Sequence, residues 1–331
     1  MNNFTYARAS SQKDAVQKAS SDRNSLYIAG GTNLVDRLKG FLDQPSQIID
    51  ISRLEMKRID KLGNGGLRLG ALVSNTEVAD NTDIRRDYPI LARAILSGAS
   101  QQIRNMATVG GNLLQRTRCP YYYDTAFPCN KREPGQGCPA IPGINRMHAI
   151  LGASEHCVAV NPSDMNVALA ALDAVVEVEG TQGKRQIPFT DFHRLPGTTP
   201  ERDTNLEPGE LITSVILPPL AFAKSGVYLK LRDRTSYAFA LISVAAAIDL
   251  TGDKIKNVRF AIGGVAHKPW RSLEAEEFLI GKTAETATFQ QAAQIALQSA
   301  KPLTYNGYKV ELAKRAIRRA LTISAKGGGV V

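Results

Sequence analysis

The sequence predicts a globular protein of two domains, each with helices and strands, and three observations support this fold class. The chain has 331 residues, and at roughly 150 residues per domain this length suggests about two domains. Hydrophobic residues make up 43% and charged residues 22%, the usual balance of a chain with a buried core. Apolar runs of strand and helix length recur, and their pattern changes after Pro218 and Pro219. We therefore expect domains at residues 1–219 and 220–331.

Strands and helices are both expected in the first domain. Residues 11–14 resemble a capping box with Asp in the Glu position, which predicts a helix to about Ala19. Apolar runs and alternation predict strands at 4–6, 25–29, 45–51, 67–71, 174–178 and 210–217. Helical spacing and caps predict helices at 32–39, 75–87, 90–97 and 167–172.

The second domain shows strands first and helices afterwards. Residues 228–232, 239–250 and 258–265 are predicted as three strands of one sheet. Residues 278–282, 288–299 and 306–321 are predicted as helices.

Composition limits the classes of partner. Lys and Arg number 41 against 31 Asp and Glu, a net charge of +10. Aromatic residues are only 6%, and no basic run carries the interleaved aromatics that stack on bases, so we expect no nucleic acid. A basic surface suits an acidic partner or solubility. No apolar run reaches the ~18 residues of a membrane span.

The first residues, MNNFTYARASSQKD, contain neither an apolar signal region nor a twin arginine. We therefore expect that any export of the chain depends on a partner.

Two glycine loops join an apolar stretch to a following turn or helix. The first is IAGGTNL at 28–34 and the second is ATVGGNL at 107–113. Glycines let backbone N–H groups approach an anion closely, although each loop alone also fits a tight turn without a ligand. Neither G-x-G-x-x-G nor G-x-x-x-x-G-K-[ST] occurs there, so no nicotinamide or ATP site is predicted. The pair of loops favours a dinucleotide with two phosphates.

The four cysteines, Cys119, Cys129, Cys138 and Cys157, lie in one stretch rich in Pro and Gly. Disulfides would need an oxidising compartment, and a chain with a large core has little need of them. Zinc sites usually show two cysteines separated by two to four residues, a spacing absent here. An iron–sulfur cluster takes four thiolates at wider spacing. From spacing alone, iron–sulfur, zinc and free thiols all remain open.

Histidines 148 and 156 lie in the same stretch, and either is a possible ligand, although four thiolates already complete a cluster site. The isolated His193 and His267 receive no role. No Ser/His/Asp set, H-E-x-x-H motif or pair of catalytic carboxylates stands out, so no catalytic residue is assigned.

Together, the glycine loops and the cysteine stretch resemble the FAD-binding subunit of the xanthine dehydrogenase, or molybdenum hydroxylase, family. The resemblance covers essentially the whole chain, through residues 28–34, 108–114, 162–164 and 228–232. It implies an α+β fold: a two-lobed FAD-binding domain of the PCMH type over 1–219, then a smaller α/β domain, similar to the CO dehydrogenase flavoprotein C-terminal domain, over 220–331.

One segment departs from the common family pattern. Most members pass almost directly from the second glycine loop to the Ser-Asp step, whereas here about forty residues intervene, at about 115–160, and contain all four cysteines. Two subgroups look similar here, the bacterial periplasmic aldehyde oxidoreductase and 4-hydroxybenzoyl-CoA reductase, and both carry an additional 4Fe-4S cluster in this subunit. Residues 115–124 (QRTRCPYYYD) and 128–132 (PCNKR) are most similar to the aldehyde oxidoreductase.

The resemblance implies FAD and a 4Fe-4S cluster as cofactors. Backbone amides of both glycine loops would hold the diphosphate, with the Thr108 hydroxyl nearby. Asp164 would accept hydrogen bonds from sugar or ribityl hydroxyls, Lys230 would lie near the flavin, and Leu114 would pack against its ring. Asp124 is a further candidate. The implied cofactor residues are Ile28, Ala29, Gly30, Gly31, Thr32, Asn33, Leu34, Thr108, Gly110, Gly111, Asn112, Leu114, Asp124, Asp164 and Lys230, and the implied metal ligands are Cys119, Cys129, Cys138 and Cys157.

The implied function is electron transfer in a heterotrimeric aldehyde oxidoreductase. A large molybdenum-cofactor subunit would oxidise the aldehyde, a small 2Fe-2S subunit would relay electrons, and this chain would pass them to an external acceptor. Export through a partner's Tat signal would place the complex in the periplasm, the alternative being the cytoplasm. Three alternatives stay open: the flavin subunit of an enzyme similar to 4-hydroxybenzoyl-CoA reductase, a flavin oxidase, for which no base is visible, and a zinc-stabilised binding module without redox activity.

Overall fold

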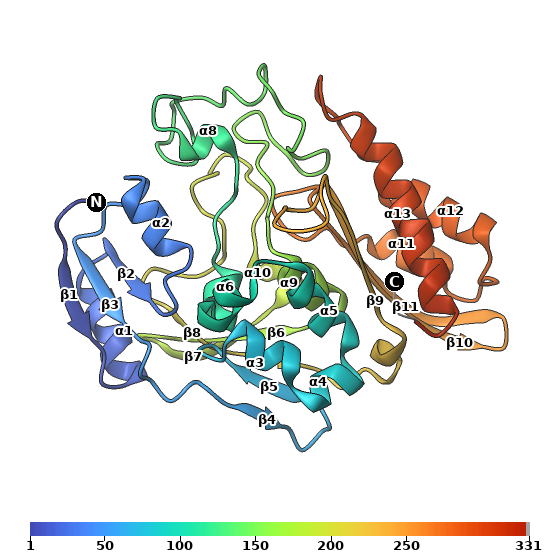
Figure 1. Ribbon diagram of the computed structural model, residues 1–331, viewed down its shortest axis with the longest axis horizontal. Helices are drawn as coiled ribbons and strands as arrows, with labels where there is room; N and C mark the ends of the chain where they lie inside the picture. The colour runs from blue at the N-terminus through green and yellow to red at the C-terminus, as the bar shows by residue number, and fades with distance from the viewer. Residues whose placement is uncertain (329–331) are drawn as a thin grey trace.

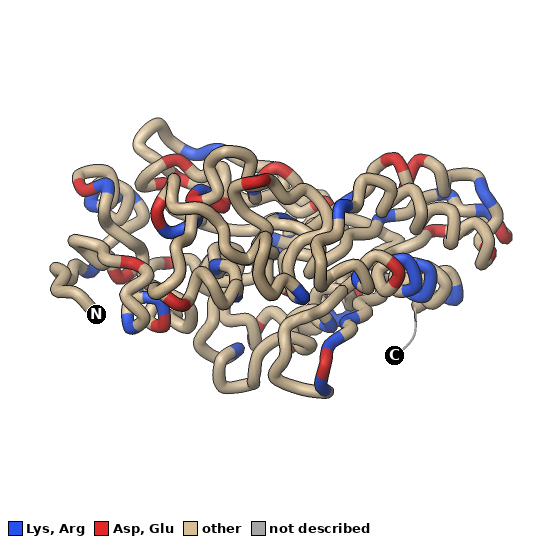
Figure 2. The backbone as a smooth tube through the Cα atoms, turned by 90° about the horizontal axis from the view of Figure 1, so that it is seen from above, with Lys and Arg blue, Asp and Glu red and all other residues tan. Residues whose placement is uncertain are grey.

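The computed structural model of the protein describes residues 1–328 and contains three sheets that follow one another along the molecule (Figure 1). In the described residues no helix has the length and apolar character needed to cross a bilayer. Lys and Arg are interspersed with Asp and Glu along the backbone (Figure 2), so the net positive charge is not confined to one segment.

The N-terminal lobe is a small parallel sheet in the order β1-β3-β2. Its elements are β1 (Thr5–Arg8), α1 (Gln12–Ser21), β2 (Ser25–Ile28), α2 (Leu34–Lys39) and β3 (Gln47–Asp50). The Ser11 side chain accepts from the Asp14 N–H, as the capping pattern predicts. The Asp14 carboxylate accepts from the Ser10 N–H.

The second lobe is an antiparallel sheet in the order β4-β5-β8-β6-β7. Its strands are β4 (Ile59–Lys61), β5 (Leu67–Gly70), β6 (Val175–Gly180), β7 (Gly183–Pro188) and β8 (Leu211–Leu217). Its helices are α3 (Asn75–Asp80), α4 (Thr82–Asp87), α5 (Pro89–Ser97), α6 (Gln101–Met106), α7 (Val109–Leu113), α9 (Asp164–Ala171) and α10 (Phe189–Phe192).

The single helix predicted for 75–87 is wrong, because the chain breaks at Asn81. This residue has extended backbone angles, and its side chain accepts from the N–H groups of Asp83 and Ile84. An asparagine that can satisfy two free N–H groups favours a new helix start over continuation of the old helix.

The C-terminal domain is an antiparallel sheet in the order β11-β10-β9, with helices covering one face (Figure 1). Its elements are η1 (Ala221–Ser225), β9 (Val227–Leu231), β10 (Ile242–Thr251), β11 (Lys254–Gly263), α11 (Leu273–Leu279), α12 (Thr286–Ala296) and α13 (Tyr308–Ala325). The three predicted strands are confirmed. The helix predicted at 278–282 is wrong: α11 begins earlier, where Ser272 caps the Ala275 N–H, and it ends at Leu279.

The segment at 115–160 is mostly irregular, with one short helix, α8 (Pro120–Tyr123). It forms loops beside α2 and α13 (Figure 1). One buried cluster unites the two N-terminal lobes, and a second fills the C-terminal domain. Ile150 and Leu151 of the segment belong to the second cluster, so the segment is anchored to the core of the C-terminal domain.

Candidate FAD and cluster site

Two cavities meet at the glycine loops. One has a volume of about 450 Å³ and the other about 280 Å³. Thr32, Asn33, Gly111, Gln115 and Pro162 line both. Every predicted cofactor residue except Asp124 lines one or both cavities. The two cavities therefore adjoin each other between the two glycine loops.

The first loop leaves its backbone donors free. Strand β2 ends at Ile28 and helix α2 begins at Leu34, and Gly31 between them has φ +70°, a conformation that favours glycine. Within residues 1–328, no protein group accepts from the N–H groups of Gly31 to Leu34. Buried or half-buried N–H groups need partners, so this loop fits a diphosphate.

The second loop differs from the expectation for its amides. Gly110 N–H donates to Ala71 O at 2.8 Å, Gly111 N–H to Thr108 Oγ1 at 3.2 Å, and Asn112 N–H to Thr108 O at 2.8 Å. Thr108 is the N-cap of α7, and its side chain satisfies the Gly111 amide. This part of the prediction is therefore corrected: in the second loop these three amides are not free for a phosphate.

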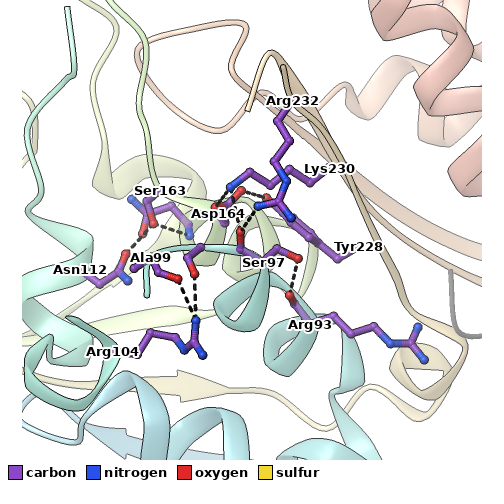
Figure 3. A network of polar contacts seen from close by, with 12 residues as sticks. Arg93, Ser97, Ala99, Arg104, Asn112, Ser163, Asp164, Tyr228, Lys230 and Arg232 are labelled. Atoms are coloured by element: carbon purple, nitrogen blue, oxygen red, sulfur yellow. Dashed lines mark hydrogen bonds and ion pairs between the residues drawn. The ribbon is translucent and has the colours of Figure 1, made fainter. Parts of the chain in front are cut away.

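A polar network includes two residues of the smaller cavity, Asp164 and Lys230 (Figure 3). Asp164 accepts from Tyr228 Oη at 2.6 Å and from Lys230 Nζ at 2.7 Å. Lys230 Nζ also donates to Ser97 O at 3.0 Å. Desolvation and the Asp164 carboxylate hold the pKa of Tyr228 well above its usual value, so its hydroxyl stays protonated. Asp164 and Lys230, two of the side chains predicted to contact the cofactor, are thus paired to each other, and Asp164 keeps lone pairs for a ligand hydroxyl.

Three cavity residues escaped the sequence analysis because they lie far apart in the chain. Asn75 lines the smaller cavity, and His193 and His267 line the larger one. All three are buried, and within residues 1–328 Asn75 Oδ1, His193 Nδ1 and both His267 ring nitrogens have no partner. Burial lowers the pKa of His193 to about 4 and that of His267 to about 3, so both rings are neutral at pH 7. These atoms are open to a ligand or water.

Two of the predicted cofactor residues, Leu114 and Asp124, lie apart from Lys230, which was predicted to lie near the flavin. Leu114 lines the larger cavity, whereas Lys230 lines the smaller one, so the two residues expected beside the flavin ring belong to different cavities. Asp124 lines neither cavity; it is exposed, and its carboxylate accepts from the Ala126 N–H in a turn.

The four cysteines are free thiols gathered within the segment at 115–160. A hydrogen bond from Cys157 lowers the pKa of Cys138 and raises that of Cys157 itself. Burial raises the pKa of Cys119 to about 11, with contributions from the charges of Cys129 and Cys138. In the described chain, no three His, Cys, Asp or Glu side chains converge as one metal ion would require.

The cysteine segment contacts the first glycine loop directly. Arg116 N–H donates to Asn33 Oδ1 at 3.0 Å, and Asn33 Nδ2 donates to Tyr123 Oη at 3.4 Å. The buried Lys131 donates to Pro200 O at 2.7 Å and pairs with Asp203, which also lies 2.6 Å from Arg116 Nε. Contacts of this kind can transmit a change in the segment to the FAD site.

The fold and the paired glycine loops are those of a flavoprotein subunit, and comparison with known proteins identifies the family. Residues 2–220 match the FAD-binding domain in molybdopterin dehydrogenase, and residues 227–323 match the CO dehydrogenase flavoprotein C-terminal domain. The chain therefore belongs to the family of FAD-binding subunits of molybdenum hydroxylases, which are oxidoreductases.

Particular relatives narrow the resemblance. The chain is 49% identical over 322 residues to the aldehyde oxidoreductase FAD-binding subunit PaoB of Escherichia coli K12, covering 97% of this chain and 98% of the relative. It is 30% identical over 315 residues to the glyceraldehyde dehydrogenase medium chain of Sulfolobus acidocaldarius, covering 94% of each.

Solved structures share the fold. Carbon monoxide dehydrogenase from Hydrogenophaga pseudoflava matches with a TM-score of 0.78 at 24% identity, covering 99% of each chain. Quinoline 2-oxidoreductase from Pseudomonas putida 86 matches with a TM-score of 0.76 at 24% identity, covering 98% of each.

Proposed function

We propose that this chain is the FAD- and 4Fe-4S-containing electron-transfer subunit of a heterotrimeric, molybdenum-dependent aldehyde oxidoreductase. The observation that carries the proposal is the identity of 49% to a named aldehyde oxidoreductase FAD-binding subunit, over nearly the full length of both chains. The complex would also contain a molybdenum-cofactor large subunit and a small 2Fe-2S subunit. This chain would pass electrons from the molybdenum subunit to an external acceptor.

The residues of the two cavities would position the cofactor. Bound FAD supplies two-electron redox chemistry to the site. The free N–H groups of Gly31 to Leu34 would hold the diphosphate, and Gly111 would let it approach. Asp164 would accept from a cofactor hydroxyl, while Tyr228 and Lys230 fix the carboxylate in place. Asn75 Oδ1, buried in the wall of the smaller cavity, would accept from the cofactor.

Cys119, Cys129, Cys138 and Cys157 would bind the cluster. Three features support this assignment: the thiols are free, they gather in one segment, and that segment has little regular structure of its own. Four thiolate–iron bonds would offset the entropy of ordering these loops, about 1–2 kcal/mol per residue for the backbone alone.

The experiment is to purify the chain with whatever co-elutes, then measure flavin, iron and molybdenum per chain together with aldehyde oxidation. Acid extraction should release FAD, and iron should exceed what a 2Fe-2S subunit alone accounts for. Recovery of FMN would refute the assignment of two phosphates to the paired loops. Zinc in place of iron in this chain would support the binding-module alternative.

The complex is proposed to act in the periplasm, carried there by a Tat signal on the small subunit after cofactor loading in the cytoplasm. A reducing cytoplasm keeps the four thiols available for cluster assembly. Deleting the small subunit's signal should strand this chain in the cytoplasm. If its location is unchanged, the proposal of export through a partner fails.

A further inference from the structure

We propose that His148 is a positioning residue for the cluster: its Nε2–H donates a hydrogen bond to the Cys119 thiolate and thereby raises the cluster's reduction potential. The inference rests on the cluster proposed above and goes beyond it, because it assigns a role to a side chain that is not one of the four ligands.

The contact that carries the proposal joins the two side chains. His148 Nε2 lies 3.1 Å from Cys119 Sγ, within the range of a hydrogen bond to sulfur. The His148 ring is buried, and within residues 1–328 its Nδ1 has no partner. A neutral imidazole carries one N–H, and an N–H buried without an acceptor is costly. The proton therefore belongs on Nε2, facing the sulfur.

The backbone on both sides of this ring is held by the C-terminal domain. At the start of α13, Asn306 Nδ2 donates to His148 O at 3.2 Å and Lys309 Nζ donates to the same carbonyl at 2.9 Å. The His148 N–H donates to Asn145 O at 3.0 Å, and Asn145 Oδ1 accepts from the Tyr305 N–H at 2.9 Å. These contacts fix the position of the ring, so that Nε2 stays within hydrogen-bonding distance of Cys119 Sγ.

The sign of the effect follows from charge. Reduction adds an electron to a cluster whose thiolates are already anionic, and a hydrogen bond to a thiolate stabilises the more negative state. Hydrogen bonds to cluster sulfurs are among the factors that set the potential. Removing the donor should therefore make the cluster harder to reduce and shift electrons toward the flavin.

The test compares three variants of the purified complex, each measured by iron content and by redox titration followed by EPR. His148→Phe removes the donor while keeping a flat ring, and His148→Gln keeps an N–H donor at similar reach. His156→Phe is the matched control, because this histidine lies in the same segment with its side chain 37% exposed and paired with Glu155 at 3.5 Å.

We expect His148→Phe to retain iron and to lower the reduction potential of the cluster. The expected change is about tenfold in the equilibrium constant of reduction, which is about 59 mV for a one-electron couple. His148→Gln should restore most of the shift, and His156→Phe should show none. Iron loss in His148→Phe with normal iron and potential in His148→Gln would also support the hydrogen bond.

Full iron with an unchanged potential in His148→Phe would overturn the proposal. Iron loss in both His148 variants would overturn it as well, because His148 would then be required as a ligand. A wild-type complex without a four-iron EPR signal would refute the cluster itself, an outcome distinct from failure of the His148 role.

Discussion

Gly30 and Gly111 occupy similar motifs, yet their surroundings differ. A Cβ on Gly30 would lie 1.8 Å from the Met106 carbonyl oxygen, so this glycine permits the close packing of two backbone segments. A Cβ on Gly111 would meet only Thr108 Oγ1, at 3.0 Å, and Gly111 lines both cavities. The first glycine is needed for the fold, and the second leaves space for a ligand.

Gly111→Val should keep the fold and lose FAD, because the added methyl groups enter the space between the two cavities. We expect the Kd for FAD to rise about tenfold or more, which corresponds to about 1.4 kcal/mol or more of binding free energy. Flavin per chain and a fluorescence titration measure this. Gly63→Val is the control, since nothing lies within 4 Å of a Cβ there. Equal FAD affinity in the two variants would remove Gly111 from the site.

Asp203 makes the stability of the folded chain depend on pH in the acid range. Burial raises its pKa, but the neighbouring Arg116 and Lys131 outweigh burial and lower it to about 2. A carboxylate whose pKa is lower in the folded chain than in the unfolded chain stabilises the fold at pH values above its unfolded pKa of about 4. This stabilisation is lost as the pH falls toward 2.

The difference in free energy of unfolding between wild type and Asp203→Asn should therefore decrease by about 2 kcal/mol from pH 5 to pH 2. Urea unfolding of the two proteins, matched in cofactor content and salt, measures the gap, and the comparison cancels the other carboxylates. A gap that stays constant over this range would show that Asp203 is not stabilised by its two cations.

At the scale of elements, the segment at 115–160 connects the proposed cluster to the FAD site. It leaves α7 beside Gly111 and returns at Ser163, whose hydroxyl donates to Asn112 Oδ1 at 2.6 Å. Arg116 contacts Asn33 of the first glycine loop. Both ends of the segment and one point within it therefore touch residues of the proposed FAD site.

Cys129→Ala should lose iron and also weaken FAD binding, although Cys129 lines neither cavity. Loosening the segment would release the contacts to Asn33 and Asn112. Iron and FAD per chain and the Kd for FAD are the measurements, with Glu133→Ala, an exposed position in the same segment, as the control. Full iron would exclude Cys129 as a ligand. Iron loss with normal FAD affinity would mean that the cluster and the FAD site are independent.

At the scale of the whole molecule, the carboxylate of the proposed flavin site is already engaged by groups from other parts of the chain. Both oxygens of Asp164, the carboxylate in the polar network of the smaller cavity, accept hydrogen bonds from neighbouring side chains. A carboxylate held in this way positions a ligand and is not a free base for a self-standing flavin oxidase.

The FAD-loaded chain purified without partners should therefore not oxidise aldehydes above the rate without protein, when an artificial electron acceptor is supplied. The complete complex, prepared in the same buffer, should be active. Aldehyde turnover by the isolated chain, free of molybdenum, would identify it as a flavin oxidase instead.

The sequence by itself determined those helices, strands and turns whose patterns of apolar residues, glycines and capping side chains span only a few residues. The strand, loop and helix around Gly30 and Gly31, the capped helix α1 and the three strands of the last sheet follow from short apolar runs, glycines and caps. Such signals fail where a side chain changes a boundary, as Asn81 does between α3 and α4. The weakly apolar strands β4 and β7 also escaped prediction, since their pairing defines them.

Only the tertiary structure decided which of the candidate residues come together. It paired Asp164 with Lys230 and Tyr228 and placed Asn75, His193 and His267 in the cavity walls. It also gave the amides of the second glycine loop internal partners and brought His148 to Cys119. The physical reason is that the Asp164, cavity-wall and His148 contacts join segments far apart in the chain, through packing that no local pattern encodes. The second-loop amides depend on the helical turn that forms after Thr108.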